Sequence, residues 1–150
     1  MADENAASIN AETLVGTWLL QEHVTTTNGK RRMTGEGHRG LLIYEKSGYM
    51  IVGINFSDQS PGVFYGGTYW VMDGKVFHEV SLSSAPQRLG KMLARTIHLE
   101  EPDLTLRDGD EVDGAEIRWR RASSEALKPW DGLELPSRED RKIPPLFEEE

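Results

Sequence analysis

Turn signals recur at short and fairly regular intervals through the body of this chain. The runs between them are short and rich in β-branched and aromatic residues, which favour strands. No amphipathic stretch of about twelve or more residues separates the runs, so the chain lacks the helices that parallel strands need as crossovers. We therefore expect an all-β protein built from antiparallel hairpins. The turn signals are Asn28-Gly29, Ser47-Gly48, Asp73-Gly74, Glu101-Pro102, Asp108-Gly109 and Asp113-Gly114.

About eight runs have strand character, and we expect them to form one antiparallel up-and-down sheet that closes into a barrel. Closure removes the exposed sheet edges, and an eight-stranded barrel can be filled by side chains or can hold one small ligand. A two-sheet sandwich is the alternative architecture. The predicted strands are residues 17–24, 40–44, 49–56, 63–72, 76–82, 92–99, 104–106 and 115–121.

The chain divides into three parts. Residues 1–13 form an N-terminal segment in which Asn10 can cap one helical turn reaching Leu14. Residues 14–121 form the predicted barrel. Residues 122–150 form an acidic, irregular C-terminal tail that holds four of the seven prolines and ends in three glutamates. This composition is typical of a solvated spacer, but the apolar residues of the tail leave open that it docks on the barrel, covers a mouth, or contacts a second subunit of a homodimer.

Charge and residue usage exclude several classes of protein. The chain has 17 Lys and Arg against 25 Asp and Glu, a net charge of -8, which opposes the binding of nucleic-acid phosphates. It has no cysteine, so disulfides, thiolate nucleophiles and Cys-containing zinc sites are excluded. No histidine pair has a recognised metal-ligand spacing, so we expect no metal. The chain starts without a signal-peptide pattern and has no run of about 18 apolar residues, so we expect no membrane partner and a cytoplasmic location.

The Asp73-Gly74 turn defines the register of one hairpin. Counting outward from it pairs Tyr69 with His78 on a single face. The same face carries Tyr65 and Val80, which we expect to contact a ligand inside the barrel. A histidine beside a tyrosine can act as an acid, a base or an oriented donor near neutral pH. A polar contact of purely structural use is the competing interpretation.

A second group of polar residues is expected to face inward. Arg95 shares its parity with Leu93 and Ile97, and a buried arginine needs a partner or an anionic ligand. Glu22 shares its parity with Trp18 and Leu20, so it is expected either to pair with Arg95 or to serve as a catalytic base, with Arg95 stabilising an oxyanion.

The remaining strand positions carry less chemistry. Asn55 and Tyr49 share one parity and are further candidates for ligand contact, although the Ser47-Gly48 turn leaves their register ambiguous. His23 and His98 fall on the outward parity, and His38 lies in a glycine-rich loop at a barrel mouth.

Gly16-Thr17-Trp18 stands at the start of the first predicted strand. Several short motifs and one arginine follow: Gly40-Leu41-Leu42-Ile43-Tyr44, Ser47-Gly48-Tyr49-Met50, Tyr65-Gly66-Gly67-Thr68-Tyr69, Val76-Phe77-His78-Glu79-Val80, Ser83-Ser84-Ala85-Pro86 and Arg95. In this order and spacing they resemble the lipocalin-like domain family, small calycin-type β-barrels of bacteria and fungi. The resemblance covers residues 14–121. It implies a ligand cavity and a closed end plugged by Trp18, with an arginine of the last strand stacked on the indole ring.

The resemblance also implies a range of functions. Families of this shape include carriers of apolar ligands and cofactor-free enzymes that isomerise or cyclise small molecules. Haem-binding barrels with the same Gly-x-Trp start use a histidine near the chain end, whereas the last histidine here is His98, so haem is not expected.

Our first hypothesis is a cofactor-independent isomerase, cyclase or lyase that acts on a small, largely apolar molecule of polyketide or terpenoid type, with Tyr69, His78, Arg95 and Glu22 as catalytic residues. A non-catalytic carrier of a hydrophobic ligand is the alternative. A protein-interaction module that uses the outer face and the tail is a third interpretation.

Overall fold

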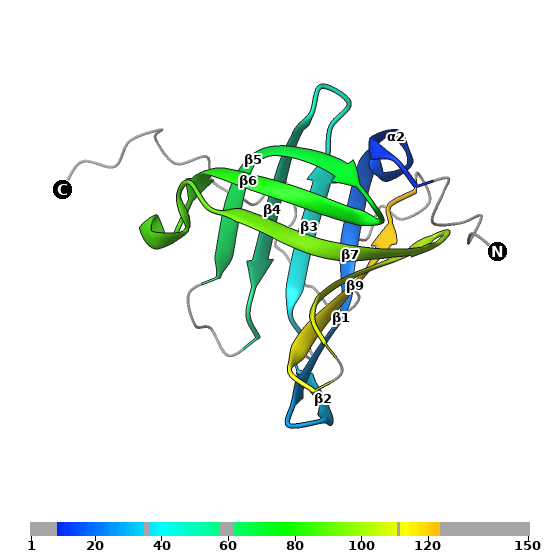
Figure 1. Ribbon diagram of the computed structural model, residues 1–150, viewed down its shortest axis with the longest axis vertical. Helices are drawn as coiled ribbons and strands as arrows, with labels where there is room; N and C mark the ends of the chain where they lie inside the picture. The colour runs from blue at the N-terminus through cyan, green and yellow to red at the C-terminus, as the bar shows by residue number, and fades with distance from the viewer. Residues whose placement is uncertain (1–8, 35–36, 58–61, 111, 124–150) are drawn as a thin grey trace, which may run out of the picture.

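A computed structural model describes residues 9–34, 37–57, 62–110 and 112–123 of the chain. The expectations for the C-terminal tail fall almost entirely outside these residues. The described part forms one antiparallel sheet whose first and last barrel strands also pair, so the sheet closes on itself (Figure 1). The predicted eight-stranded up-and-down barrel is therefore confirmed, and the sandwich is excluded.

The barrel is built from β1 and β3 to β9, each next to its neighbour in sequence except at the closure between β1 and β9. A further strand, β2, pairs only with β1. The strands are β1 Gly16–Thr27, β2 Lys30–Thr34, β3 Arg39–Tyr44, β4 Tyr49–Asn55, β5 Val63–Met72, β6 Lys75–Ser83, β7 Met92–Glu100, β8 Asp103–Gly109 and β9 Gly114–Arg121.

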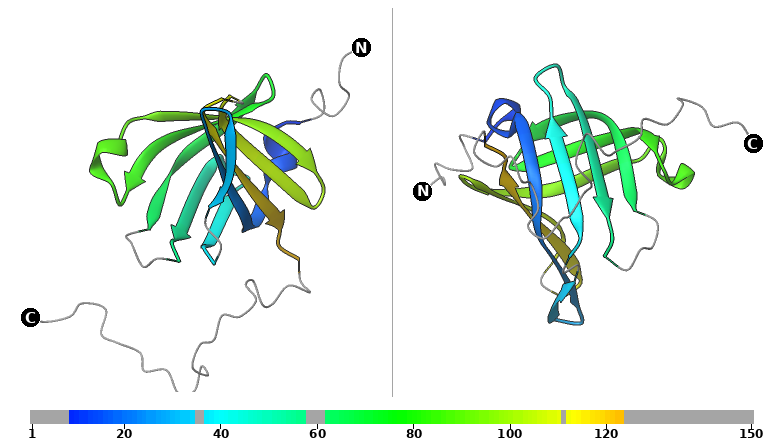
Figure 2. Two further views of the ribbon diagram at one scale, coloured as in Figure 1. Left: turned by 90° about the horizontal axis from the view of Figure 1, so that it is seen from below. Right: turned by 180° about the vertical axis from the view of Figure 1, so that it is seen from behind.

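The sequence did not predict β2. Its residues, Lys-Arg-Arg-Met-Thr, show no apolar alternation, because this strand forms a hairpin with the outer half of β1 and does not contribute a wall to the barrel. Asn28 and Gly29 join the two strands with φ values of 52° and 78°, the left-handed conformation that a tight two-residue hairpin turn requires. The hairpin projects beyond the barrel at the lower end of Figure 1, and Figure 2 shows the same projection from behind.

One end of the barrel is closed by the N-terminal segment. The short helix α2, Ala11–Leu14, starts at Asn10, whose side chain and backbone exchange hydrogen bonds with Thr13, as the capping prediction required. Trp18 is fully buried beneath it and donates its indole N–H to the Leu14 carbonyl at 2.9 Å. The plug role expected for Trp18 is confirmed.

Arg121, at the end of β9, completes the closed end. Its guanidinium carbon lies 4.2 Å from the centre of the Trp18 ring. It also donates to the carbonyls of Val15 and Thr13, at 2.7 and 2.8 Å, and makes two bonds of 2.8 Å to the Glu101 carboxylate. One side chain thus ties the start of the barrel, its last strand and the turn between β7 and β8.

A β-bulge in β1 changes the phase of that strand. Leu20 pairs with Trp119 of β9, but the next paired residue is Glu22 with Arg118, so Gln21 is the extra residue. Because side chains alternate along a strand, one extra residue reverses which positions face inward. The bulge therefore determines which β1 side chains reach the open half of the barrel.

Candidate functional site

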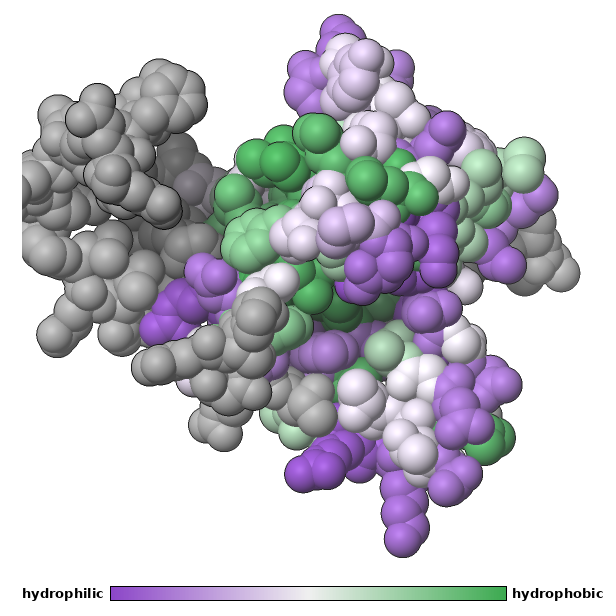
Figure 3. Space-filling model, turned by 90° about the vertical axis from the view of Figure 1, so that its left-hand side faces the viewer, coloured by the Kyte–Doolittle hydropathy of each residue, from purple (hydrophilic) through white to green (hydrophobic). Residues whose placement is uncertain are grey.

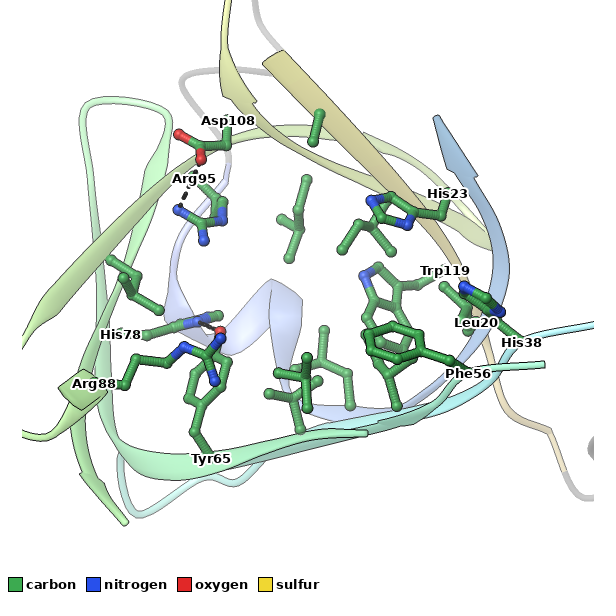
Figure 4. Close-up of a pocket in the computed structure, with 18 residues that line it drawn as sticks. Leu20, His23, His38, Phe56, Tyr65, His78, Arg88, Arg95, Asp108 and Trp119 are labelled. Carbon is green, nitrogen blue, oxygen red and sulfur yellow. Dashed lines mark hydrogen bonds and ion pairs between the residues drawn. The ribbon is translucent and has the colours of Figure 1, made fainter. Parts of the chain in front are cut away.

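A cavity of about 280 Å³ opens at the end of the barrel opposite α2 (Figure 4). This volume is close to the lower range of pockets that hold small ligands. In Figure 3, hydrophobic surface gathers in and above a hollow bordered by hydrophilic side chains, on the side of the molecule where η1, Pro86–Arg88, lies. The wall is largely apolar, with a few polar groups among aliphatic and aromatic side chains. Its polar or charged lining residues are His23, His38, Tyr65, His78, Arg88, Arg95 and Asp108.

His78 of β6 lies between two tyrosine hydroxyls. Its Nε2 is 2.6 Å from the hydroxyl of Tyr44, and its Nδ1 is 2.8 Å from the hydroxyl of Tyr65. His78 and Tyr44 are only 3% and 1% exposed. Tyr65 lines the cavity and Tyr44 does not, so the chain of three groups runs from the barrel interior to the cavity wall.

Burial shifts the pKa of each of these three groups so that its neutral form is favoured. Burial, and to a smaller extent the charge of Arg95, lower the pKa of His78 from 6.5 to about 3. Burial raises the pKa of Tyr65 and raises that of Tyr44 well above its ordinary value. All three groups are therefore neutral at pH 7, and one nitrogen of His78 donates while the other accepts.

Two arginines stand beside this chain on the same side of the cavity (Figure 4). Arg95 of β7 faces inward, as its parity predicted, and among the described residues its ion-pair partner is Asp108 at 3.8 Å. Asp108 is 62% exposed, so this long contact holds Arg95 only weakly. The guanidinium of Arg88, at the end of η1, lies 5.9 Å from the centre of the Tyr65 ring.

The β5–β6 hairpin has the predicted register, with Tyr69 opposite His78. The Tyr69 side chain points inward and is 6% exposed, but its hydroxyl donates to the Glu45 carbonyl at 3.0 Å and does not bond His78. Val80 is likewise buried, and neither residue lines the cavity. Of the residues expected on this face, the structure brings Tyr65 and His78 to the cavity and leaves Tyr69 and Val80 in the packing around it.

The inward position expected for Glu22 is wrong, because the bulge at Gln21 turns Glu22 away from the cavity. Its carboxylate lies 2.9 Å from Arg118 on β9, so the expected pairing with Arg95 is also wrong. The same bulge brings His23 into the cavity wall, against the outward position predicted for it. His98, by contrast, is exposed as predicted, with 70% of its side chain accessible.

The inward positions expected for Tyr49 and Asn55 are wrong as well. The turn after β3 places Tyr44 opposite Met50, so Met50, Val52 and Ile54 take the inner positions of β4. Tyr49 is 62% exposed and Asn55 lies on the outer face with it.

Sequence reasoning missed several lining or supporting residues. Tyr44 alternates with Leu42 on β3, a signal that could have placed it inside the barrel. His38 also lines the cavity, where its Nδ1 accepts from the Ser57 backbone N–H at 3.0 Å and its ring lies 4.9 Å from that of Phe56. Burial and the neighbouring His38 lower the pKa of His23. No pattern within the loop at 34–38 indicated the contact between His38 and Ser57, because Ser57 comes from a loop that is distant in sequence.

Comparisons with known proteins do not assign the chain to a family. No protein-family model and no curated protein sequence matches the chain. Within the described ranges, no three His, Asp or Glu side chains are grouped so that they could hold a metal ion. In the same part of the chain, no helix is both long enough and apolar enough to cross a membrane.

Proposed function

We propose that this barrel binds a small, largely apolar molecule in its cavity and acts on it as a cofactor-independent isomerase, cyclase or lyase. The observation that carries the proposal is the hydrogen-bonded chain Tyr44–His78–Tyr65, which ends at the cavity wall beside Arg95. Three titratable groups in line, one of them a buried neutral histidine, are typical of sites that handle protons.

The chain can be oriented so that it serves a ligand oxygen. In this orientation the Tyr44 hydroxyl donates a hydrogen bond to Nε2 of His78, and the Nδ1–H of His78 donates a hydrogen bond to the Tyr65 oxygen. The Tyr65 O–H is then directed to an acceptor in the cavity. Arg95 lies on the same wall and would stabilise the negative charge that develops on that oxygen. The proton that leaves a neighbouring carbon would be taken up by the neutral imidazole of His23, which also lines the cavity, and returned from it to another carbon of the ligand. Such a proton shift needs no redox cofactor.

A non-catalytic carrier is the second candidate. Its support is the direction of the pKa shifts, because a histidine with a pKa of about 3 is a weak base and tyrosines with raised pKa values are weak acids. In a carrier the same groups would only orient the ligand. The cytoplasmic location and the polyketide-like or terpenoid-like ligand both stay predictions from the sequence.

Native mass spectrometry of the purified protein, followed by extraction of any bound compound, tests both candidates. The compound is returned to fresh protein in D₂O and analysed again. A compound that comes back altered, or with deuterium on carbon, supports the enzyme, whereas one that comes back unchanged supports the carrier. A protein that holds no compound and binds none from a panel of apolar ketones and acids would overturn the proposal of a ligand cavity.

A further inference from the structure

Two buried N–H groups in the cavity wall have no hydrogen-bond partner. They are Nη1 of Arg88 and Nε1 of Trp119, and both residues line the cavity. Folded proteins pair nearly all of their buried donors, so an unpaired one in a cavity calls for a partner that enters it. The third such atom among the described residues, Nε of Arg118, belongs to a side chain that pairs with Glu22 outside the cavity.

The two donors come from different walls. Arg88 lies at the end of η1, beside Tyr65 and on the same side as Arg95 and His78, whereas Trp119 lies on β9 near His23 (Figure 4). The wall between these two sides is largely aliphatic, from residues such as Leu42, Val52 and Leu106. A ligand that meets both donors must therefore carry two acceptors separated by an apolar part.

The charge on the two sides differs. Arg88 and Arg95 supply two positive charges, and Asp108, the single carboxylate among the described residues of the lining, is largely exposed to solvent. The other side has the neutral indole of Trp119. The first side therefore favours an anionic oxygen and the second a neutral one, because a guanidinium bonds charged acceptors more strongly than neutral ones.

We propose that the ligand of this cavity is an amphipathic organic anion with two separate oxygen acceptors. Its negative oxygen, from a carboxylate or an acidic enol, is held by Arg88 and Arg95. Its second, neutral oxygen accepts the hydrogen bond of Trp119 Nε1. This inference rests on the proposed function and narrows the class of molecule that the cavity takes.

Competition binding tests the charge of the ligand. The neutral fluorescent probe N-phenyl-1-naphthylamine is displaced at pH 7.5 by octanoate, by nonane-2,4-dione or by octan-1-ol. At least one of the two acids is expected to bind about tenfold or more tightly than the alcohol, and which of them does so identifies the source of the anionic oxygen. Arg88→Met is expected to abolish this preference. Arg32→Met, which removes a charge from the exposed strand β2, is expected to keep it.

The indole N–H signals in a ¹H–¹⁵N spectrum test the second acceptor. A set of octanoates with a ketone at carbon 4, 5, 6 or 7 is compared with octanoate. At least one ketone is expected to bind about threefold or more tightly than octanoate and to shift the Trp119 signal downfield. The Trp18 signal is an internal control, because its N–H already bonds the Leu14 carbonyl at 2.9 Å. Trp119→Phe is expected to remove the ketone preference, and Trp70→Phe, on the outward stack with Phe77, to retain it.

Measurements on the wild-type protein alone can contradict the anionic oxygen and the second acceptor separately. Equal affinities for the acids and the alcohol, with the probe bound, would overturn the anionic ligand and leave the proposed function standing. A preference for anions without any preference for a ketone, and with an unmoved Trp119 signal, would overturn the second acceptor. A protein that binds neither the probe nor any competitor would overturn the proposed function itself.

Discussion

The Tyr44 hydroxyl, inside the barrel, lies 2.6 Å from Nε2 of His78, and Nδ1 of the same ring bonds the Tyr65 hydroxyl at the cavity wall. The imidazole is therefore fixed at both nitrogens, and its orientation does not depend on a ligand. Preorganisation of this kind lowers the cost of orienting groups at the moment of binding or reaction.

Tyr65→Phe should lower turnover by about a hundredfold or more. Of the two hydroxyls in the hydrogen-bonded series Tyr44–His78–Tyr65, it removes the one that lines the cavity. The affinity for the ligand should fall by less than about tenfold. Tyr69→Phe is the matched control, since its hydroxyl bonds a backbone carbonyl away from the cavity, and it should keep the turnover. Deuterium incorporation into the extracted ligand and its binding constant provide the two readouts. Equal losses in both quantities for Tyr65→Phe would favour the carrier.

The free energy of unfolding should fall as the pH is lowered from 6.5 toward 3. His78 has a folded-state pKa of about 3 and an unfolded value near 6.5, so in this window the unfolded chain binds a proton that the folded chain does not. This single group contributes a slope of up to about 1.4 kcal/mol per pH unit. Above 6.5 its contribution is constant and fully present.

Urea unfolding at several pH values measures this slope. Between pH 6.5 and 5 the carboxylates contribute little, so His78→Gln should reduce the slope there to the smaller part that His23 contributes, because the pKa of His23 is also lowered. His98→Gln removes an exposed histidine and should leave the slope as it is. An unchanged slope in His78→Gln would contradict the buried neutral state of His78.

Arg121→Met should lower the free energy of unfolding by about 2–4 kcal/mol. The change removes the cation over Trp18 and leaves the carbonyls of Val15 and Thr13 without their donor. Arg120→Met, at the next position, removes an exposed arginine whose ion pair with Asp103 is 3.2 Å long, and it should cost less than about 1 kcal/mol. Similar costs for the two variants, from urea midpoints, would mean that the closed end is not held as described.

His23→Gln should change ligand affinity, whereas Glu22→Gln should not, because the bulge at Gln21 turns His23 toward the cavity and Glu22 toward Arg118. The imidazole signals of His23 should also move when octanoate or a ketone analogue is added, and those of exposed His98 should stay in place. The reverse pattern, with Glu22 sensitive and His23 silent, would contradict the register change in β1.

Local signals predicted the parts of the structure that depend on local geometry. The Asp73-Gly74 turn, with φ values of 53° and 74°, fixes the register of its hairpin, so the inward positions of Tyr65 and His78 could be counted from the sequence. Arg95 faces inward as its parity among apolar neighbours indicated.

The errors arose where the geometry depends on pairing between distant segments. The bulge at Gln21 exists only in the ladder between β1 and β9, and nothing in residues 16–27 signals it. The turn around Gly48, with a φ of +98°, adds a residue that places Met50 opposite Tyr44 and turns Tyr49 outward. The strand β2 lacks an apolar face because it lies outside the barrel wall.

The closure between β1 and β9 has a consequence for how the chain folds. Every other pair of neighbouring barrel strands is close in sequence, but Trp18 meets its ladder partner Arg121 only after almost the whole barrel has been synthesised. While β9 is still inside the ribosome, the nascent chain therefore forms an open sheet in which β1 and β8 are unpaired edge strands. Such edges are prone to associate with other chains. Because the loop joining the two edges is so long, the last step is expected to limit the folding rate, and truncation before residue 114 should yield aggregates in place of a smaller folded domain.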